Sequence, residues 1–323
     1  MNSPRQQPNQ HAIPMNKFKG ETHVSPFYLL ILIYLITALP LNSADSPYRS
    51  SDFIEIDGHT IHTRVFNANK AETVVFLHGF GAHTYSFNSV TDRIGDYRIL
   101  LYDRPGFGFS GRPLDVTWDN NPYDYSQQAD LLKSILDYYD IDKAHIAGHS
   151  AGGFIALLFA DKYPGYTDKL ILINPSFTGR RINPLLRKTG RWSIFKPLII
   201  NKVSDIAENG ERIIEKSWFD KDKLSRDIIE AYKAPLNEPH WQQGLYYMTL
   251  GNMPQWDTCD LCNIEKDVLV MTALFDSIIE PSGVIEYASY LPNHKLIVFD
   301  SCGHIPHEEI PSKFVNTLLN FLE

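Results

Sequence analysis

The feature that most constrains the fold is an alternation, from residue 52 onward, of short β-branched apolar runs with longer amphipathic stretches. This order is typical of strands that alternate with helices. The later runs, such as VVFL, ILLY and LIVF, are almost continuously apolar, as expected for parallel strands that helices bury on both faces. We therefore predict an α/β protein with an eight-stranded, mostly parallel, doubly wound sheet. The expected strands are 53–56, 61–66, 73–77, 97–102, 143–147, 169–173, 267–272 and 295–299.

The alternation fails between residues 177 and 263, where helix-like segments are separated by Pro and Gly. We predict that 177–263 is a helical cap inserted between a first core part, 50–176, and a second core part, 264–323. No repeat or long linker sets this segment apart, so we expect it to pack on the core.

The first 44 residues differ in kind from the rest. Residues 1–26 are polar and predict a disordered tail. Lys17 and Lys19 precede an apolar run, 27–41, that falls short of the ~20 apolar residues of a spanning helix. This order predicts a signal or anchor within 27–44, and hence export to the periplasm or the exterior, or membrane association through 27–41. Met15 is a second candidate start.

The net charge and the cysteines limit which binding partners and ligands we expect. The formal net charge of -8 and the lack of a Lys/Arg run disfavour a nucleic-acid partner, so we expect a small-molecule substrate. Cys259 and Cys262 form a C-x-x-C pair without a second pair or a His cluster to complete a zinc site. They are either a small disulfide or two unrelated thiols. We predict no metal and no cofactor.

One motif predicts a sharp turn between an expected strand and an expected helix. Gly148-His149-Ser150-Ala151-Gly152 follows an expected buried strand and opens an expected helix, which is the context of a nucleophile elbow. The turn is so sharp that larger side chains two residues on either side of the serine would collide. Ser150 is therefore the candidate nucleophile, beside the N–H groups of the helix that follows.

With this motif, the chain from about residue 52 to its end resembles a capped serine hydrolase of the α/β-hydrolase fold. His78-Gly79-Phe80-Gly81 resembles the oxyanion loop of that family, and residues 103–110 (DRPGFGFS) resemble its loop after the fourth strand. The resemblance implies an oxyanion hole made by the N–H groups of Phe80 and Ala151. We interpret His78 as a brace of its loop, and Asp103 with Arg104 as a structural ion pair.

The remaining catalytic groups should come late, because the fold has the chain order Ser, then Asp or Glu, then His. His304 follows the last expected strand, in a run (GHIPHEEIP) that resembles the family's histidine loop. It is the candidate base. Asp276, just past the strand before it, is the candidate acid that orients the His304 tautomer. Its competitors are Glu280 and Asp300, and we interpret His149 and His307 as bystanders.

A serine nucleophile predicts acyl transfer. It disfavours the dehalogenase and epoxide hydrolase activities of the fold, which use an aspartate at the elbow. We expect hydrolysis of a small apolar carboxylic ester through an acyl-enzyme, with an apolar pocket under the cap. The candidate substrate contacts are Trp118, Trp192, Trp218 and Trp241. The alternative is that tryptophans at such spacing serve in ordinary helix packing.

Two alternatives stay open. One is a carbon–carbon bond hydrolase of vinylogous diketones, in which cap arginines would bind a substrate carboxylate. Four arginines near the start of a cap are more often a solvated surface. The other alternative is a ligand receptor that keeps the fold without turnover. The arginines in question are Arg180, Arg181, Arg187 and Arg191.

Overall fold

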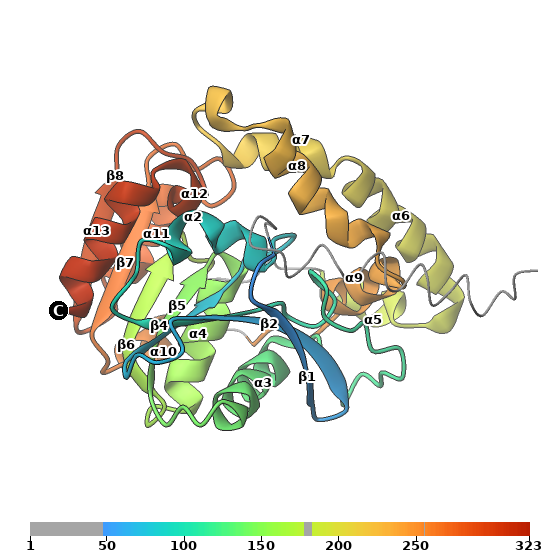
Figure 1. The fold of residues 1–323 in the computed structure, drawn as a ribbon. Helices are drawn as coiled ribbons and strands as arrows, with labels where there is room; N and C mark the ends of the chain where they lie inside the picture. The colour runs from blue at the N-terminus through green and yellow to red at the C-terminus, as the bar shows by residue number, and fades with distance from the viewer. Residues whose placement is uncertain (1–47, 178–182, 255) are drawn as a thin grey trace, which may run out of the picture. The chain divides into compact units, whose positions relative to one another are not determined.

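A computed structural model describes residues 48–177, 183–254 and 256–323. Its eight strands form one sheet in the order β1-β2-β4-β3-β5-β6-β7-β8, in which β3 to β8 are parallel and β2 is antiparallel to β1 and β4 (Figure 1). The prediction of an eight-stranded, mostly parallel α/β sheet is confirmed. The strands are β1 Ser51–Ile56, β2 His59–Phe66, β3 Thr73–Leu77, β4 Arg98–Tyr102, β5 Ala144–His149, β6 Thr167–Ile173, β7 Val268–Ala273 and β8 His294–Phe299.

The hairpin between β1 and β2 closes with two residues. Ile56 pairs with His59, and both Asp57 (φ 52°) and Gly58 (φ 78°) have positive φ. A two-residue turn of this kind needs positive φ at both central positions, which Asp-Gly tolerates well.

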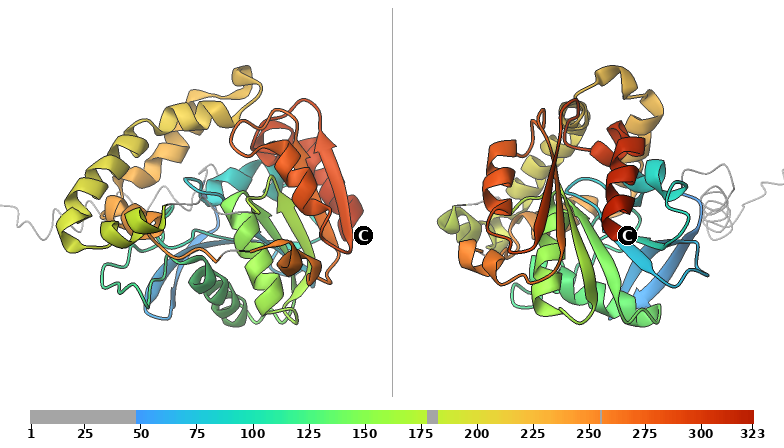
Figure 2. Two further views of the ribbon diagram at one scale, coloured as in Figure 1. Left: turned by 180° about the vertical axis from the view of Figure 1, so that it is seen from behind. Right: turned by 90° about the vertical axis from the view of Figure 1, so that its left-hand side faces the viewer.

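Side chains that alternate along the strands make two cores, one on each face of the sheet. Val75 and Leu77 of β3 pack toward α3, α4 and α11, whereas Val74 and Phe76 pack toward α2 and α13. Figure 2 shows the sheet with helices on either side. The core helices are η1 Thr84–Phe87, α2 Asn88–Thr91, α3 Tyr125–Tyr138, α4 Ala151–Lys162, α11 Pro281–Ala288, α12 Pro306–Glu309 and α13 Pro311–Leu322.

Further helices are inserted between β6 and β7, inside the segment 177–263 for which the sequence predicts a cap. In Figure 1, α6, α7 and α8 arch over the upper right of the core, α5 and α9 lie at its right, and α10 lies beside β6. The His304 N–H of the core donates to the Ser217 carbonyl of the insertion at 2.7 Å. The inserted elements are α5 Pro184–Gly190, η2 Ser193–Phe195, α6 Lys196–Glu208, α7 Gly210–Ser217, η3 Lys221–Lys223, α8 Arg226–Lys233, η4 Ala234–Asn237, α9 Trp241–Thr249 and α10 Thr258–Cys262.

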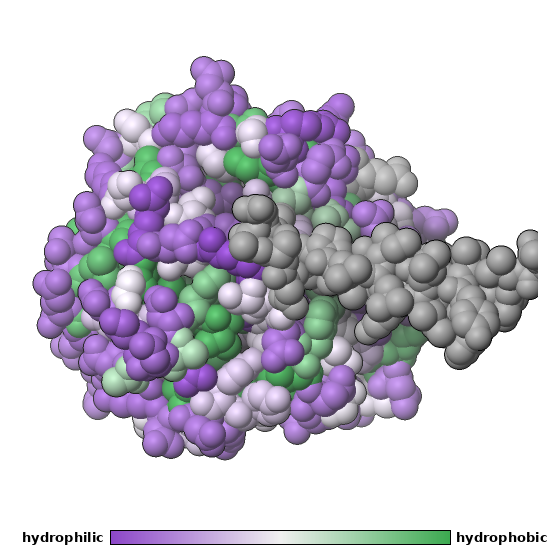
Figure 3. Space-filling view, in the orientation of Figure 1, coloured by the Kyte–Doolittle hydropathy of each residue, from purple (hydrophilic) through white to green (hydrophobic). Residues whose placement is uncertain are grey.

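Much of the surface in Figure 3 is hydrophilic, with apolar residues in separate patches. Among the described residues, no helix combines the length and the apolarity that crossing a bilayer requires. The predicted tail 1–26 and the predicted apolar segment 27–41 lie outside the described residues. Cys259 and Cys262 of α10 are exposed and free, and Cys302 is buried and free.

Candidate active site

The turn between β5 and α4 places Ser150 in a strained conformation. β5 ends at His149, α4 begins at Ala151, and Ser150 between them has φ 53° and ψ −118°. A positive φ at a non-glycine residue costs on the order of 1–3 kcal/mol and persists only where the surroundings hold it. Here the Ser150 N–H donates to the Ile173 carbonyl of β6 (2.9 Å), and its carbonyl accepts from the Gly153 N–H (3.0 Å). This geometry is that of a nucleophile elbow.

The two glycines around the turn are required by close contact. A Cβ on Gly148 would lie 2.3 Å from the Gly152 oxygen, and a Cβ on Gly152 would lie 2.4 Å from the Leu77 oxygen. Both distances are far shorter than a van der Waals contact distance. The contacted atoms belong to the backbone, which cannot move freely. The elbow therefore tolerates no side chain at either position, which is the steric reason for the G-x-S-x-G pattern.

Gly152→Ala is expected to destabilise the protein by about 2 kcal/mol or more, because the new methyl group has to displace the β3 backbone. Denaturant unfolding followed by circular dichroism measures the change. Gly165→Ala is the matched control, since nothing lies within 4 Å of a Cβ at that position. The control should stay within about 0.5 kcal/mol of wild type. Equal stabilities for the two variants would contradict the steric argument.

The candidate base and acid meet in loops after the last two strands. His304 Nδ1 lies 2.7 Å from Asp276 Oδ2, and both side chains are buried. The other oxygen of Asp276 accepts from the N–H groups of Ile278 (2.8 Å) and Ile279 (2.9 Å), which fixes the carboxylate. An Nδ1–H bond to a carboxylate leaves Nε2 unprotonated, as a general base requires.

The structure does not bring the competing acids to His304. Asp300 is exposed and lies 3.1 Å from Lys313 Nζ. Glu280 precedes α11, where it is the N-cap residue. Among these three carboxylates, only Asp276 contacts the imidazole.

His149 connects the elbow to the His304 loop. Its Nε2–H donates to the His304 carbonyl (2.9 Å), and the two rings have centroids 4.6 Å apart. Asn174 Nδ2 donates to the same carbonyl at 2.8 Å. Burial lowers the pKa of His149 well below its usual value, so this imidazole is neutral at physiological pH. The sequence-based interpretation of His149 as a bystander missed this contact, for which adjacency to Ser150 was the only available signal.

Ser150 and His304 belong to one site without a direct hydrogen bond. In the described part of the chain, no hydrogen bond joins Ser150 Oγ to the His304 ring, although the neighbouring His149 touches that ring. Catalytic hydrogen bonds are often long in the absence of substrate and tighten when the substrate binds. The arrangement is therefore compatible with proton transfer from Ser150 to His304.

Two backbone segments pass close to Ser150. A Cβ on Gly79 would lie 3.1 Å from Ser150 Cβ, so the loop that carries Phe80 runs directly beside the nucleophile. Ala151 is the first residue of α4, and N–H groups in the first turn of a helix have no partner inside the helix. These positions allow the N–H groups of Phe80 and Ala151 to face a developing oxyanion.

His78 braces the Phe80 loop, as the sequence predicts. Its Nδ1 lies 2.8 Å from the Gly79 oxygen, and its Nε2 accepts the Arg104 N–H at 3.0 Å. The Arg104 guanidinium also donates to the Gly79 oxygen (3.0 Å) and to Gln128 Oε1 (2.8 Å).

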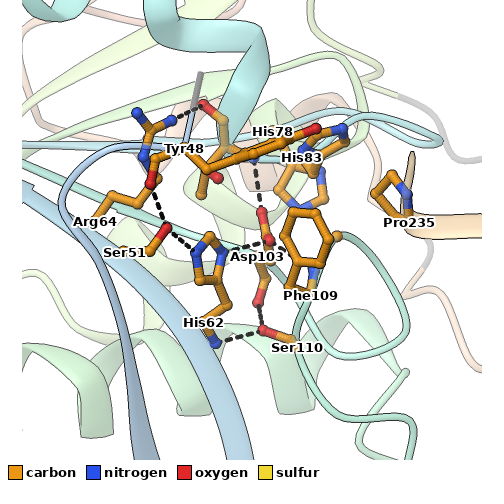
Figure 4. A network of polar contacts seen from close by, with 12 residues as sticks. Tyr48, Ser51, His62, Arg64, His78, His83, Asp103, Phe109, Ser110 and Pro235 are labelled. Carbon is orange, nitrogen blue, oxygen red and sulfur yellow. Dashed lines mark hydrogen bonds and ion pairs between the residues drawn. The ribbon is translucent and has the colours of Figure 1, made fainter. Parts of the chain in front are cut away.

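The predicted ion pair between Asp103 and Arg104 is wrong. The buried Asp103 carboxylate contacts His62 Nδ1 at 2.7 Å and accepts the N–H groups of Thr84 (2.7 Å) and Phe109 (2.9 Å) (Figure 4). Burial alone would raise the pKa of Asp103, but the charge and hydrogen bond of His62 lower it overall, so the carboxylate is ionised. Asp103 thereby joins β2, η1 and the loop after β4 behind the site.

A cavity of about 180 Å³ opens beside His149 and His304, between the core and the insertion. Its wall is mostly apolar, with a few polar side chains at its margin. The apolar side chains include Phe80, Phe107, Ile213, Ile214, Trp241 and Leu245, and the polar ones include His83, Arg112, Tyr232 and Lys233.

Of the four tryptophans predicted to contact substrate, only Trp241 lines this cavity. Trp118 packs on Tyr246, Tyr247 and the Arg191 guanidinium. Trp192 is exposed and stacks on Phe195, while Trp218 is buried away from the cavity. The predicted contact is thus corrected for Trp118, Trp192 and Trp218, because helix packing turns each of them elsewhere.

The cap arginines that the structure describes also lie outside the lining of the cavity. Arg191 donates to the Leu250 carbonyl at 2.7 Å, and neither Arg187 nor Arg191 lines the cavity. Arg180 and Arg181 lie outside the described residues. The cations that line the cavity are instead Arg112, from the loop after β4, and Lys233 of α8. Arg112 donates to the Ser110 carbonyl at 2.6 Å, and Lys233 Nζ lies 3.8 Å from Glu230 Oε1. Arg112 forms no ion pair with any acidic residue of 48–177, 183–254 or 256–323.

Tyr232 of α8 joins the cavity to α12 through Glu308. The Glu308 carboxyl contacts the Tyr232 hydroxyl, and Ser86 Oγ lies 2.6 Å from it. Burial raises the pKa of Glu308 to about 7. Because the folded protein then binds a proton that the unfolded chain releases near pH 4.5, stability should fall as pH rises from about 4.5 to 7.

Glu308→Gln is expected to remove this pH dependence, since the amide stays neutral. The unfolding free energy of the variant minus that of the wild type should therefore increase by on the order of 1–3 kcal/mol from pH 5 to pH 8. Denaturant titrations at the two pH values measure this. A stability difference that does not change with pH would show that Glu308 is ionised throughout.

An elbow serine with a histidine and a carboxylate from later loops defines the class of serine hydrolases. The sequence profile of the alpha/beta hydrolase fold matches residues 72–311, and the chain belongs to this family.

The relatives have diverse activities. A 2-hydroxy-6-oxo-6-phenylhexa-2,4-dienoate hydrolase of Burkholderia cepacia is 27% identical over 264 residues, covering 79% of this chain and 89% of the relative. A proline iminopeptidase of Heyndrickxia coagulans is 26% identical, covering 84% of this chain and 97% of the relative. A solved thermophilic esterase from Thermogutta terrifontis has a TM-score of 0.67 at 20% identity, covering 84% of this chain and 97% of its own.

Proposed function

We propose that Ser150 attacks a carbonyl carbon of a small substrate. His304 Nε2 takes the proton of Ser150 Oγ as the oxygen bonds to carbon, and Asp276 stabilises the resulting imidazolium. The N–H groups of Phe80 and Ala151 stabilise the oxyanion. The tetrahedral intermediate then expels its leaving group, which takes the proton from His304, and an acyl-enzyme remains. Water activated by His304 releases the acid product. The hydrogen bond of 2.7 Å between His304 and Asp276 supports these roles.

The bond cleaved is, we propose, a carbon–carbon bond beside a ketone in a conjugated keto acid. The observation that carries this proposal is the composition of the cavity, which combines a mostly apolar wall with the guanidinium of Arg112. Glu238 and Asp103 act on the charge of Arg112, but neither forms an ion pair with it among the described residues. An apolar wall suits a conjugated chain, and Arg112 suits a carboxylate. The dienoate hydrolase of B. cepacia, by its name, acts on a substrate of this kind.

The size of the cavity limits the substrate. An apolar cavity of about 150 Å³ accommodates benzene, so a cavity of about 180 Å³ accommodates one ring or a short acyl chain beside His149 and His304. Long acyl chains would have to extend past the margin of the cavity.

Hydrolysis of a carboxylic ester is the second candidate. It is favoured by the predominance of apolar side chains such as Ile213, Ile214 and Leu245 in the wall, because an uncharged ester needs no cation. The same serine chemistry serves both substrates, and only the leaving group differs, an enol carbon in one case and an alcohol oxygen in the other.

Parallel assays on purified wild type and Ser150→Ala distinguish the two. One assay follows loss of the absorbance of 2-hydroxy-6-oxo-6-phenylhexa-2,4-dienoate, and the other follows nitrophenolate release from p-nitrophenyl esters of graded chain length. A kcat/KM for the dienoate at least a hundredfold above that for every ester supports carbon–carbon cleavage. The reverse preference overturns it in favour of the esterase. Absence of both activities in folded protein would overturn both candidates.

A further inference from the structure

The face of the insertion formed by α5, η2 and the first two turns of α6 carries exposed apolar side chains. We call it the α5–α6 face. Ile194 is 77% exposed and Trp192 is 55% exposed, although both are side chains that folding normally buries. The apolar members of the α5–α6 face are Leu185, Trp192, Ile194, Phe195 and Leu198.

Helix α6 is apolar on two sides, and the described residues cover only one of them. Val203 is buried, and Ile199 and Ile200 pack on the cluster around Phe107 and Tyr246. Leu198, which follows Ile194 by one helical turn, points away from that cluster and is 62% exposed. A helix with apolar residues outside its core-facing stripe has a second surface to bury.

The α5–α6 face is also positively charged in a protein that is negatively charged as a whole. Residues 183–204 contain no acidic residue, whereas the chain has a net charge of -8. Their cations are Arg187, Lys188, Arg191, Lys196 and Lys202. None of these cations forms an ion pair with a carboxylate in the part of the chain that the structure describes.

Four of these five cations fall into two groups. Arg191 and Lys196 point inward, where Arg191 contacts the Leu250 carbonyl and Lys196 lies 3.0 Å from the Tyr247 hydroxyl. Asp119 and Asp124 also act on Arg191 from that side. Lys188 and Lys202 are exposed, and Lys202 stands one turn beyond Leu198 on α6. The outward surface therefore combines apolar side chains with uncompensated ammonium groups.

We propose that the α5–α6 face docks on the surface of an anionic lipid bilayer, with Trp192, Ile194 and Leu198 in the headgroup region. Tryptophan is enriched at membrane interfaces, and lysines flanking apolar side chains are attracted to acidic lipids. A second copy of this chain is a poorer occupant, because pairing two such faces would bring like charges together. In Figures 1 and 2, α6 lies at the edge of the insertion far from β8.

An environment-sensitive probe tests docking at this face in the full chain. Cys259→Ser and Cys262→Ser remove the two exposed thiols. Ile194→Cys in this background is labelled with a nitrobenzoxadiazole group, and Tyr138→Cys, at a 53% exposed residue of α3, is the matched control. Vesicles of phosphatidylcholine with phosphatidylglycerol should shift the emission of the probe at position 194 to the blue and leave the control unchanged.

A charge variant tests the lipid class. Lys188→Gln with Lys202→Gln should lower the vesicle partition coefficient measured at position 194 about thirtyfold, since each cation contributes about fivefold near an acidic surface. A probe at 194 that does not respond, or that responds no more than the probe at 138, would overturn the proposal. So would an equal response to vesicles without phosphatidylglycerol, or a concentration-dependent shift without vesicles, which would indicate self-association instead.

Discussion

Ser150→Ala should lower kcat by about 10⁴-fold or more for every substrate that the wild type hydrolyses. The change removes the only atom that forms the covalent intermediate, while the binding cavity and the oxyanion donors stay in place. The side chain of Ser150 is not part of the hydrogen bonds that hold the elbow, which come from its N–H and its carbonyl. Steady-state kinetics with the preferred substrate measure the effect, and the denaturant midpoint should stay close to that of wild type.

Ser289→Ala is the matched control, because it removes the same hydroxyl from an exposed position whose partner is the Glu286 carbonyl. Its kcat should stay within about twofold of wild type. A serine-directed phosphonate should also inactivate wild type with a single exponential and label Ser150. Retained turnover in Ser150→Ala would overturn the assignment of the nucleophile.

Asp276→Asn should lower kcat by about 10⁴-fold near neutral pH, as the corresponding change does in a serine protease. The cause is the tautomer of His304. Asp276 Oδ2 accepts the Nδ1–H at 2.7 Å, whereas its Oδ1 is already held by the N–H groups of Ile278 and Ile279. In the variant the amide carbonyl keeps those N–H groups, so the NH₂ group faces Nδ1 and donates to it. The ring then carries its proton on Nε2, where it cannot accept one from Ser150.

The loss should appear in kcat and leave KM largely unchanged, because Asp276 does not line the cavity. Asp300→Asn is the matched control, since Asp300 is exposed and pairs only with the surface residue Lys313. A larger loss in Asp300→Asn than in Asp276→Asn would contradict the assignment of the acid.

The sequence alone predicted most of the fold, because each strand and helix has a local signature. The expected strands 61–66 and 169–173 lie within β2 and β6, and α4 begins directly after the elbow serine, where a helix was expected. The Asp57-Gly58 turn and the elbow glycines were also readable, since their backbone requirements act over a few residues.

The candidate catalytic residues were predicted from their order rather than from any contact. Ser150, Asp276 and His304 follow three different strands, and parallel neighbours in a sheet end at one edge. The sequence therefore placed all three groups at the same edge. It could not supply the contact between His149 and the His304 loop, because that contact depends on how two loops pack.

Tertiary structure decided the partners of side chains that the sequence left with several choices. Asp103 neighbours Arg104 in the chain but bonds to His62, because β2 pairs with β4 with Thr63 opposite Tyr102. Trp241 lines the cavity while Trp192 faces solvent, although both lie in the insertion. Periodicity and turn chemistry act along the chain and are readable from it, whereas the direction of a side chain depends on how whole elements pack against one another.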